Sequence, residues 1–212
     1  MRITSSLAVL VISLTSAQVV LAQTNVTIYS DSLVNGWSDV SYGCTRNFAT
    51  PAPVHSGSDS IRITMTNAYG GLALSCSNLI DTTSFSSVSF WLHGGTVGGQ
   101  QLQMYGTLNY SAQSASVPLA APVANTWQEY TVPLSALGVA NTNDFTGFAI
   151  QNSSGSTESS FYVDDIQLNA LTAPPTVVHF EINAGEPIRI ADARWFGLNA
   201  AVWDSDFDTP TK

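Results

Sequence analysis

Basic residues are scarce in this chain of 212 residues, which has 6 Lys and Arg against 15 Asp and Glu. Its formal net charge is -9 at pH 7. Proteins bind nucleic acid and anionic membrane surfaces through Lys and Arg, so we expect neither as a partner. Charged residues of both signs make up only 10% of the chain, while Ser, Thr, Asn, Gln and Gly abound. This composition is typical of a secreted all-β domain.

The chain also lacks an apolar run of the roughly 20 residues that a membrane span requires. Residues 1–22 contain one charge, Arg2, followed by a short apolar stretch over residues 7–14 and then small residues. This pattern predicts a secretory signal peptide, cleaved before Gln23. We therefore expect the mature chain to be secreted and extracellular, with no membrane anchor.

Cysteine is equally rare, since Cys44 and Cys76 are the only two. An even number of cysteines in an oxidising compartment favours one disulfide, and the alternative is a pair of buried thiols. Parity places Cys76 on the inner face of its strand. Acceptor triplets for N-glycosylation begin at Asn25, Asn109 and Asn152, which are predicted to be exposed and to carry glycans if the source is eukaryotic.

Long helical periods are absent from residues 24–170, where short alternating runs are broken by Gly, Pro, Asn and Ser. Nine strands are expected, over residues 26–30, 38–42, 60–66, 71–76, 87–93, 101–108, 127–132, 146–151 and 161–168. Short strands at this spacing predict a β-sandwich or barrel, and the segment is long enough for one complete core. Alternation assigns to the inner faces Ile61, Ile63, Met65, Leu72, Leu74, Val88, Phe90, Leu92, Leu102, Met104, Leu108, Phe148 and Ile150.

The predicted closing strand, residues 161–168, carries the adjacent carboxylates Asp164 and Asp165. Strict alternation puts them on opposite faces, so at least one should lie near buried apolar neighbours. A buried carboxylate needs a partner, which can be a cation, an Arg or backbone N–H groups. If the first and last strands lie side by side, Asp31 is a candidate third ligand of a structural Ca²⁺. The alternative is that both acids end the strand and face water.

Large aromatic side chains occur at outward positions of two predicted strands. Trp91 and His93 alternate with core residues on one strand, and Gln103 and Tyr105 do so on another. If these strands are neighbours, one sheet presents all four side chains outward. Flat rings surrounded by amides suit a sugar, whose C–H face stacks on the ring while amides bond its hydroxyls. The alternative is that a loop, such as residues 69–71 or 94–100, folds over them.

Other residues extend or limit this candidate sugar face. Further candidates for sugar contact are Trp37, Tyr42 and Tyr69, which lie in Gly-bordered loops at the sheet edge. His93 has no His or Cys at metal-ligand spacing, which favours a hydrogen-bonding role. A glycan on Asn109, which shares the parity of Tyr105, would crowd the face.

A change of composition near residue 171 marks a domain boundary. Residues 171–176 are rich in Pro and Thr and predict a short, stiff linker. Residues 177–212 contain two strand-like runs and an apolar, Trp-rich segment, which so short a piece cannot bury alone. We expect the truncated start of a second domain there, and hence a short incomplete C-terminal extension of the sandwich.

Four segments, taken in order, resemble a known family. They are Ser30–Trp37, Pro53–Ile61, Ala124–Leu134 and Phe161–Leu168. Together they resemble the galactose-binding-like jelly rolls that serve as carbohydrate-binding modules of secreted glycoside hydrolases. The resemblance implies a jelly-roll β-sandwich, a structural Ca²⁺ between the opening and closing strands, and glycan binding on one sheet face or on the loops at its rim.

The segment Asn183–Asp204 is similar to the entry into an α-L-arabinofuranosidase-like hydrolase domain. Retaining enzymes of that kind use two carboxylates about 5 Å apart. The resemblance implies that these residues come from later strands of a barrel, beyond Lys212.

These patterns predict a secreted carbohydrate-binding module of a glycoside hydrolase, monomeric, binding plant or microbial polysaccharide and non-catalytic by itself. One alternative is an arabinofuranosidase-type enzyme, either with its catalytic part missing or with acids among Asp204, Asp206 and Asp208, although such a terminal cluster is more often a solvated loop. Another alternative is a cell-surface domain that binds protein, which an exposed apolar patch of more than a few hundred Å² would favour.

Overall fold

The structure, a computed structural model, describes residues 23–171. The predicted signal peptide, the linker beyond residue 171 and the hydrolase-like extension lie outside the described residues. The strands are β1 (Val26–Tyr29), β2 (Trp37–Asp39), β3 (Cys44–Thr50), β4 (Ser60–Met65), β5 (Gly71–Ile80), β6 (Phe85–His93), β7 (Leu102–Leu108), β8 (Ser111–Pro118), β9 (Trp127–Pro133), β10 (Phe145–Asn152) and β11 (Glu158–Ala170). One short 3₁₀ helix, Thr82–Ser84, precedes β6.

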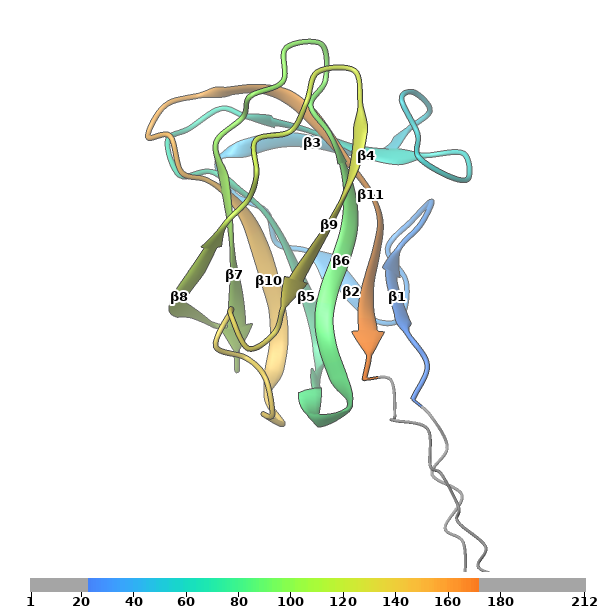
Figure 1. Cartoon of the computed structure of the whole chain (residues 1–212), viewed down its shortest axis with the longest axis vertical. Helices are drawn as coiled ribbons and strands as arrows, with labels where there is room; N and C mark the ends of the chain where they lie inside the picture. The colour runs from blue at the N-terminus through green and yellow to red at the C-terminus, as the bar shows by residue number, and fades with distance from the viewer. Residues whose placement is uncertain (1–22, 172–212) are drawn as a thin grey trace, which may run out of the picture. The chain divides into compact units, whose positions relative to one another are not determined.

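These strands form two stacked antiparallel sheets (Figure 1). The six-stranded sheet has the order β3-β4-β11-β6-β9, with β1 pairing β11 off this path, and the five-stranded sheet has the order β2-β5-β10-β7-β8. The predicted all-β jelly-roll sandwich is confirmed. Among residues 23–171 no helix is long and apolar enough to cross a membrane.

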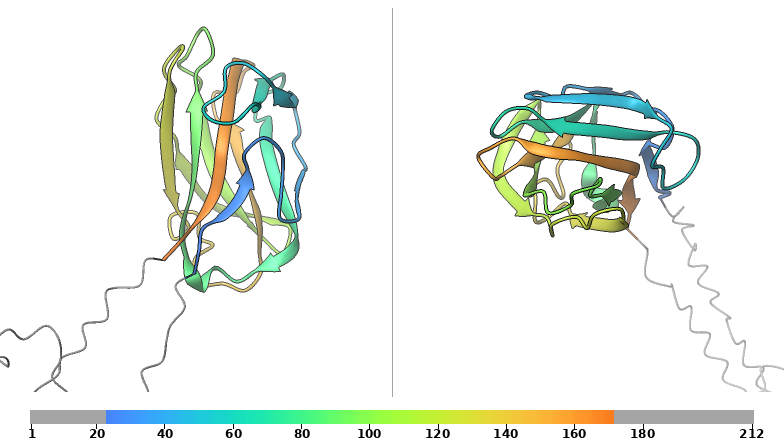
Figure 2. Two further views of the ribbon diagram at one scale, coloured as in Figure 1. Left: turned by 90° about the vertical axis from the view of Figure 1, so that its right-hand side faces the viewer. Right: turned by 90° about the horizontal axis from the view of Figure 1, so that it is seen from above.

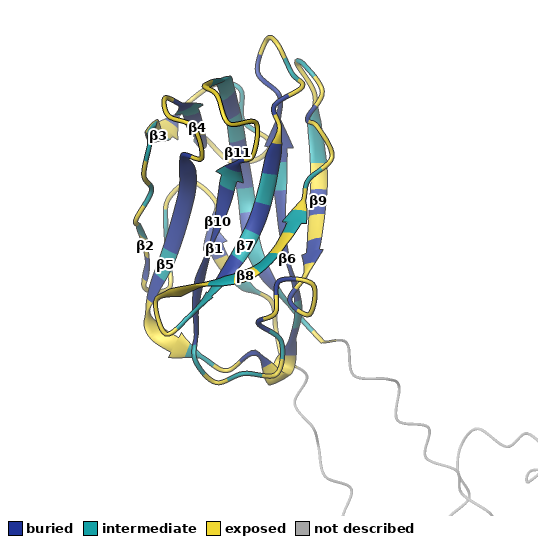
Figure 3. Cartoon of the chain, turned by 90° about the vertical axis from the view of Figure 1, so that its left-hand side faces the viewer, coloured by how far each residue is buried: buried dark blue, intermediate teal, exposed yellow. Residues whose placement is uncertain are grey.

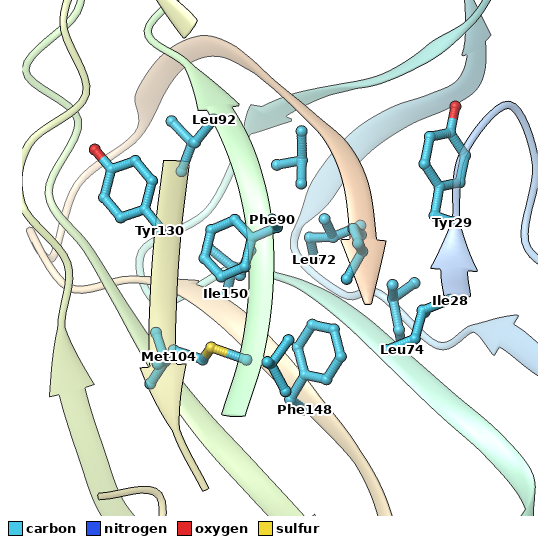
Figure 4. Packing of buried hydrophobic residues seen from close by; sticks show 14 of the residues in the cluster. Ile28, Tyr29, Leu72, Leu74, Phe90, Leu92, Met104, Tyr130, Phe148 and Ile150 are labelled. Carbon is cyan, nitrogen blue, oxygen red and sulfur yellow. The ribbon is translucent and has the colours of Figure 1, made fainter. Parts of the chain in front are cut away.

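The core lies between the two sheets and is built from the predicted inner faces. Phe90 and Leu92 of β6 face Met104, Phe148 and Ile150 of the five-stranded sheet (Figure 4). Each such side chain contributes about 1.5–3 kcal/mol when it is buried. Every predicted inner-face residue is buried except Leu108, which is half-buried. In Figure 3 the central strand β10 is accordingly mostly buried and β5 is buried in its first half, while the edge strand β8 is not buried.

The opening and closing strands lie side by side, as predicted. Val26 of β1 is the antiparallel partner of Leu168 of β11, so the two ends of the described domain leave it together (Figure 2). This pairing also places Asp31, just after β1, on the same side of the sandwich as the middle of β11.

A β-bulge interrupts β11 at its two acids. The register with β6 shifts between Asp164 and Gln167, and Asp165 has a positive φ of 47°. Val163 before the bulge and Ile166 after it are both fully buried. Strict alternation would have put them on opposite faces, so that expectation was wrong: a bulge inserts one residue and returns the following side chains to the core.

The predicted disulfide is absent, because Cys44 and Cys76 are free thiols. The Sγ of Cys44 lies 3.5 Å from the carbonyl oxygen of Gly71, at the start of β5. From residue 71 to residue 76 a strand spans roughly 16 Å, whereas disulfide-bonded Cα atoms are at most about 7 Å apart. Cys76 does lie on the inner face, as parity predicted. Burial raises the pKa of the Cys44 thiol, which keeps it protonated.

Candidate functional site: two hollows on opposite outer faces

Strand register arranges the outer face of the five-stranded sheet in rows. One row runs Tyr42, Gly71, Gln151, Gln103 and Pro118. The next row runs Ala73, Ala149, Tyr105 and Ser116. Aromatic and amide side chains therefore stand beside small ones, which is the arrangement that produces a groove.

The small side chains leave a hollow of about 210 Å³ on this face. Its floor includes Ala73, Ser75 and Ala149, and its walls include Val40, Tyr105 and Tyr110. The hydroxyl of Tyr110 donates to the carbonyl of Ser77 at 3.1 Å, which holds that ring across the end of the hollow. We call this site the tyrosine hollow.

A chain of hydrogen bonds borders the tyrosine hollow. Gln103 Nε2 donates to Gln151 Oε1 at 2.8 Å, Gln151 Nε2 donates to the Tyr42 hydroxyl at 3.0 Å, and that hydroxyl lies 2.9 Å from the hydroxyl of Tyr105. A Cβ at Gly71 would lie only 3.0 Å from Cζ of Tyr42, so glycine lets this ring lie against β5. The rings are thus held in place before any ligand arrives.

The tyrosine hollow is uncharged. Among the described residues that line it there is no acid or base. Burial, and then the neighbouring Tyr42 hydroxyl, raise the pKa of Tyr105 above its ordinary value. The phenol therefore keeps its proton and acts as a hydrogen-bond donor or acceptor.

The sequence-based grouping of Trp91, His93, Gln103 and Tyr105 on one face was wrong. Trp91 and His93 stand on β6 in the six-stranded sheet, whereas Gln103 and Tyr105 stand on β7 in the five-stranded sheet. The two strands are not neighbours, and their outer faces point in opposite directions. Gln103 and Tyr105 belong to the tyrosine hollow.

Trp91 is partly covered by the loop of residues 51–59. The imidazole of His55 stacks on the indole at a ring-centroid distance of 3.7 Å and an interplanar angle of 13°. Trp127 meets the same imidazole edge-on at 5.9 Å. A loop therefore covers one face of Trp91, as in the alternative raised from the sequence, but it is the loop of residues 51–59 and not residues 69–71 or 94–100.

His93 is removed from the candidates for sugar contact, because it is only 7% exposed. Its ring lies 5.2 Å from that of Trp127 and 5.7 Å from that of Tyr162. Its Nδ1 accepts the Gly95 N–H at 3.0 Å, and burial lowers its pKa, which suits a neutral acceptor. This is the hydrogen-bonding role that the sequence favoured.

The structure separates Trp37 from Tyr69. Trp37 is 6% exposed and packs in the core, with ring centroids 6.3 Å from Phe145 and 5.8 Å from Phe148, so it is not a sugar-contact residue. Tyr69 is 58% exposed. Its carbonyl accepts a hydrogen bond from Gln151 Nε2 at 3.1 Å, which puts it at the rim of the tyrosine hollow.

Asp164 is fully buried, as expected for at least one of the paired acids. Its Oδ2 accepts the backbone N–H groups of His55 at 2.9 Å and Ser56 at 3.4 Å, and its Oδ1 accepts that of Asp165 at 2.8 Å. Backbone N–H groups, one of the three partners expected, therefore satisfy it. Burial raises the pKa of Asp164 despite these donors.

Asp165 and Asp31 bind the same loop from other positions. Asp165 Oδ2 lies 2.6 Å from His55 Nδ1, and Asp165 Oδ1 accepts the Ser56 hydroxyl at 2.7 Å. Asp31 Oδ1 accepts the N–H groups of Ser58 at 2.6 Å and Asp59 at 3.0 Å, which lower the pKa of Asp31.

This arrangement does not fit one shared calcium ion. Within residues 23–171 no three His, Cys, Asp or Glu side chains form a group that could hold a metal. The oxygens of Asp31 and Asp164 face N–H donors, and a cation would have to displace these. Calcium binding stays a prediction, but Asp31, Asp164 and Asp165 do not form the shared ligand set on which that prediction was based.

The three predicted glycosylation sites differ in exposure. Asn25 and Asn109 are exposed, and Asn25 Oδ1 accepts the Ala170 N–H at 3.0 Å. Asn152 is fully buried, and its amide nitrogen donates to the carbonyls of Ser156 and Asn67. The prediction for Asn152 was wrong, because this nitrogen is unavailable to a glycan in the folded domain.

Sequence reasoning missed Tyr110 and Gln151. Gln151 and Ala149 lie on the parity opposite the correctly predicted Phe148 and Ile150, so alternation alone identifies them as outward. Tyr110 lies in the turn after β7 with a positive φ of 63°, and no periodic pattern marks it.

Solved structures similar to this chain include carbohydrate-binding modules. A family 11 carbohydrate-binding module from Clostridium thermocellum, in complex with a β-1,3-1,4-mixed-linked tetrasaccharide, has a TM-score of 0.52 and 12% identity over 69% of this chain and 95% of that one. The family 11 module of the cellulosomal cellulase Lic26A-Cel5E of the same organism has a TM-score of 0.52 and 14% identity over 73% of this chain and 99% of that one. These likenesses show the fold.

The family model of the expansin-like protein C-terminal domain matches residues 28–170, and the chain belongs to this family. A protein named endoglucanase from Dictyostelium discoideum is 29% identical over 151 residues, which are 67% of this chain. The chain spans only 21% of the length of that relative. The predicted resemblance to carbohydrate-binding modules is confirmed for the sandwich, while the arabinofuranosidase-like segment lies outside the described residues.

Proposed function

We propose that this domain is a secreted, monomeric, non-catalytic carbohydrate-binding module that holds a polysaccharide chain in the tyrosine hollow. The observation that carries the proposal is the hydrogen-bonded row of Tyr42, Gln151 and Gln103 beside a hollow walled by Tyr105 and Tyr110. Rings that are held in place give a sugar a stacking surface at little entropic cost.

The exposed side chains around the hollow support a sugar as the ligand. Eight large hydrophobic residues are exposed in the described domain, and Val40, Tyr42, Tyr69 and Tyr110 are gathered at this face. Three of these four are tyrosines, whose hydroxyls bind water or sugar, so the surface is wet rather than a continuous apolar patch.

The chemistry of the hollow favours a neutral glucan. Ring faces accept the C–H face of a pyranose, and phenol and amide groups match its hydroxyls. No charge in the lining would select a uronic acid or an amino sugar. A family 11 module bound to a mixed-linked β-glucan tetrasaccharide and a relative named endoglucanase support the same class of ligand, from plant or microbial polysaccharide.

We further propose that the domain accompanies a glycoside hydrolase, whose catalytic residues belong to another part of the protein. Within residues 23–171, Asp31, Asp164 and Asp165 are engaged with the loop of residues 51–59. Asp39 pairs with Arg46, and Asp81 caps the short 3₁₀ helix. Such a module serves to keep an enzyme near its insoluble substrate.

Affinity electrophoresis of the full chain in gels containing neutral polysaccharides tests this function. Cellulose derivatives and mixed-linked β-glucan should retard the wild type, and Tyr105→Ala should weaken binding about ten-fold by removing a stacking ring. Leu79→Ala is the matched control, since Leu79 is an exposed apolar residue outside the lining of the hollow. Equal mobility of the wild type in every gel would refute the proposal.

A further inference from the structure

The outer face of the six-stranded sheet has a hollow of its own, of about 220 Å³. Its lining includes Trp91 and Ser89 of β6, Glu129 of β9, and Asp165 and Gln167 of β11. Thr27 and Tyr29 of β1, with Ser30 just after that strand, complete it on the other side. We call this site the acidic hollow, because two carboxylates stand at its wall.

A row of polar side chains forms the floor of the acidic hollow. Register places Thr27 opposite Gln167, Gln167 opposite Ser89, and Ser89 opposite Thr131, across four strands. Gln167 Nε2 donates to the Ser89 hydroxyl at 3.3 Å, which orients the amide and leaves its oxygen directed away from Ser89. As in the tyrosine hollow, the floor is a row of side chains from neighbouring strands. Here the row carries hydroxyl groups, where the tyrosine hollow has the methyl groups of Ala73 and Ala149.

Trp91 gives the acidic hollow a stacking surface. His55 covers one side of the indole, and His55 does not line the hollow. The part of Trp91 that lines the hollow is therefore on the side away from His55. The His55 ring, whose Nδ1 lies 2.6 Å from Asp165 Oδ2, packs against the opposite face of the indole and holds it in place.

We propose that the acidic hollow is a second sugar-binding site, which takes a neutral sugar through stacking on Trp91 and hydroxyl hydrogen bonds to Glu129 and Asp165. Carboxylates accept hydrogen bonds from sugar hydroxyls, and such charge-assisted bonds are stronger than neutral ones. Glu129 is exposed and has no hydrogen bond to another described residue, so its oxygens are available to a ligand.

The same carboxylates exclude acidic sugars. A uronic acid in the acidic hollow would bring a third negative charge close to Glu129 and Asp165, and the whole chain already carries a net charge of -9. The ligand class of this site is thus a neutral glycan, and anionic polysaccharides such as polygalacturonate are rejected.

The two sites face away from each other, because they occupy the outer faces of two stacked sheets. One glycan chain cannot lie in both hollows without passing around the sandwich. A domain with both sites therefore holds two chains at once and bridges neighbouring polysaccharide strands.

Tryptophan fluorescence of the full chain distinguishes the two sites. The residues that line the tyrosine hollow include no tryptophan, whereas Trp91 lines the acidic hollow. Cellohexaose should therefore change the fluorescence of the wild type and of Tyr105→Ala, and the change should vanish in Trp91→Phe. Phenylalanine keeps a ring against His55, which protects the fold. Oligogalacturonate should change nothing.

A second variant tests the carboxylate. In the Tyr105→Ala background, Glu129→Ala should weaken the remaining cellohexaose binding about ten-fold, which is the loss of one charge-assisted hydrogen bond. Asp144→Ala, which removes the same charge from a residue that lines neither hollow, should leave it unchanged.

Each outcome separates this inference from the function proposed above. If gels retard the wild type but cellohexaose leaves its fluorescence unchanged, the acidic hollow is not a sugar site and the tyrosine hollow stands. If Glu129→Ala abolishes all binding while Tyr105→Ala has no effect, the tyrosine hollow falls and the acidic hollow stands. If no neutral glycan retards or perturbs the wild type, both proposals fall.

Discussion

The two outer faces of the sandwich share a plan and differ in charge. Each has a hollow that lies over a row of small or polar side chains, with an aromatic residue at its wall. The five-stranded sheet uses Tyr105 and Tyr110 with no charge, while the six-stranded sheet uses Trp91 with Glu129 and Asp165. Strand register therefore decides where a hollow forms, and only the outward residue types decide what it can hold.

The two faces also differ in what covers them. Tyr42, Tyr69 and Tyr110 are 40%, 58% and 61% exposed on the five-stranded side. On the six-stranded side the loop of residues 51–59 lies over part of the face. It is held by Asp31, Asp164 and Asp165, which the sequence pattern predicted to be metal ligands. These acids therefore position the loop, and His55 of the loop in turn positions the indole of Trp91.

Removing the acid that anchors this loop should have the largest effect. Asp164→Ala leaves the N–H groups of His55, Ser56 and Asp165 without their acceptor, next to a buried strand. We expect the free energy of unfolding to fall by about 3 kcal/mol, measured by urea denaturation at pH 7. Binding at the tyrosine hollow should persist in the folded fraction, since Asp164 lies in the other sheet.

The matched control for this variant is Asp144→Ala, which removes a carboxylate from a loop away from residues 51–59. Its stability should stay within about 0.5 kcal/mol of the wild type. A stability loss in Asp164→Ala no larger than that in the control would mean that the loop is held by packing alone, and the comparison of the two faces would lose its physical basis.

The strands that the sequence identified are those with strong apolar alternation. β5, β6 and β10 bury regular inner faces, and their core residues were predicted, although the predicted range of β5 ended at Cys76 and the strand ends at Ile80. β3 and β8 were missed, and each is an edge strand of its sheet. An edge strand such as β8 (Ser111–Pro118), whose sequence SAQSASVP consists mostly of small and polar residues, buries too little apolar surface for a pattern to show.

The site was harder to predict than the core, because it depends on which strands are neighbours. Parity identified Trp91 and Tyr105 as outward, but their separation into two sheets follows from the jelly-roll order, which local sequence does not encode. The bulge at Asp165 and the stacking of His55 on Trp91 are likewise contacts between distant segments. Of the residues that were missed, Gln151 is the one that strand alternation could have identified as outward-facing.

A smaller perturbation opens the six-stranded face without removing its anchor. His55→Ala takes away the ring that stacks on Trp91 and leaves the backbone N–H of residue 55 to bond Asp164. We expect a stability loss of about 1 kcal/mol and stronger quenching of tryptophan fluorescence by acrylamide, because the indole gains exposure. Retardation by neutral glucan through the tyrosine hollow should not change. Unaltered quenching would show that the imidazole does not cover Trp91 in solution.

The smallest expected effect concerns the ion pair that joins the edges of the two sheets, Arg46 Nε to Asp39 Oδ2 at 2.6 Å. Burial alone would raise the pKa of Asp39, but hydrogen bonds from Ser41 and Arg46 outweigh it and lower that pKa below the ordinary 3.8. The stabilisation is therefore present above pH 3.8 and is lost as the pH falls through the lowered value.

Asp39→Asn should accordingly destabilise the protein by about 0.5 kcal/mol at pH 7, because a solvent-exposed pair contributes little. The difference in melting temperature between wild type and variant should shrink as the pH falls from 3.8 through the lowered pKa of Asp39, below which Asp39 is uncharged like the asparagine. Neither sugar site should respond, since Asp39 lines neither hollow. A change in binding at either face would show that the two sheets are coupled through their edge, and the faces would no longer count as independent.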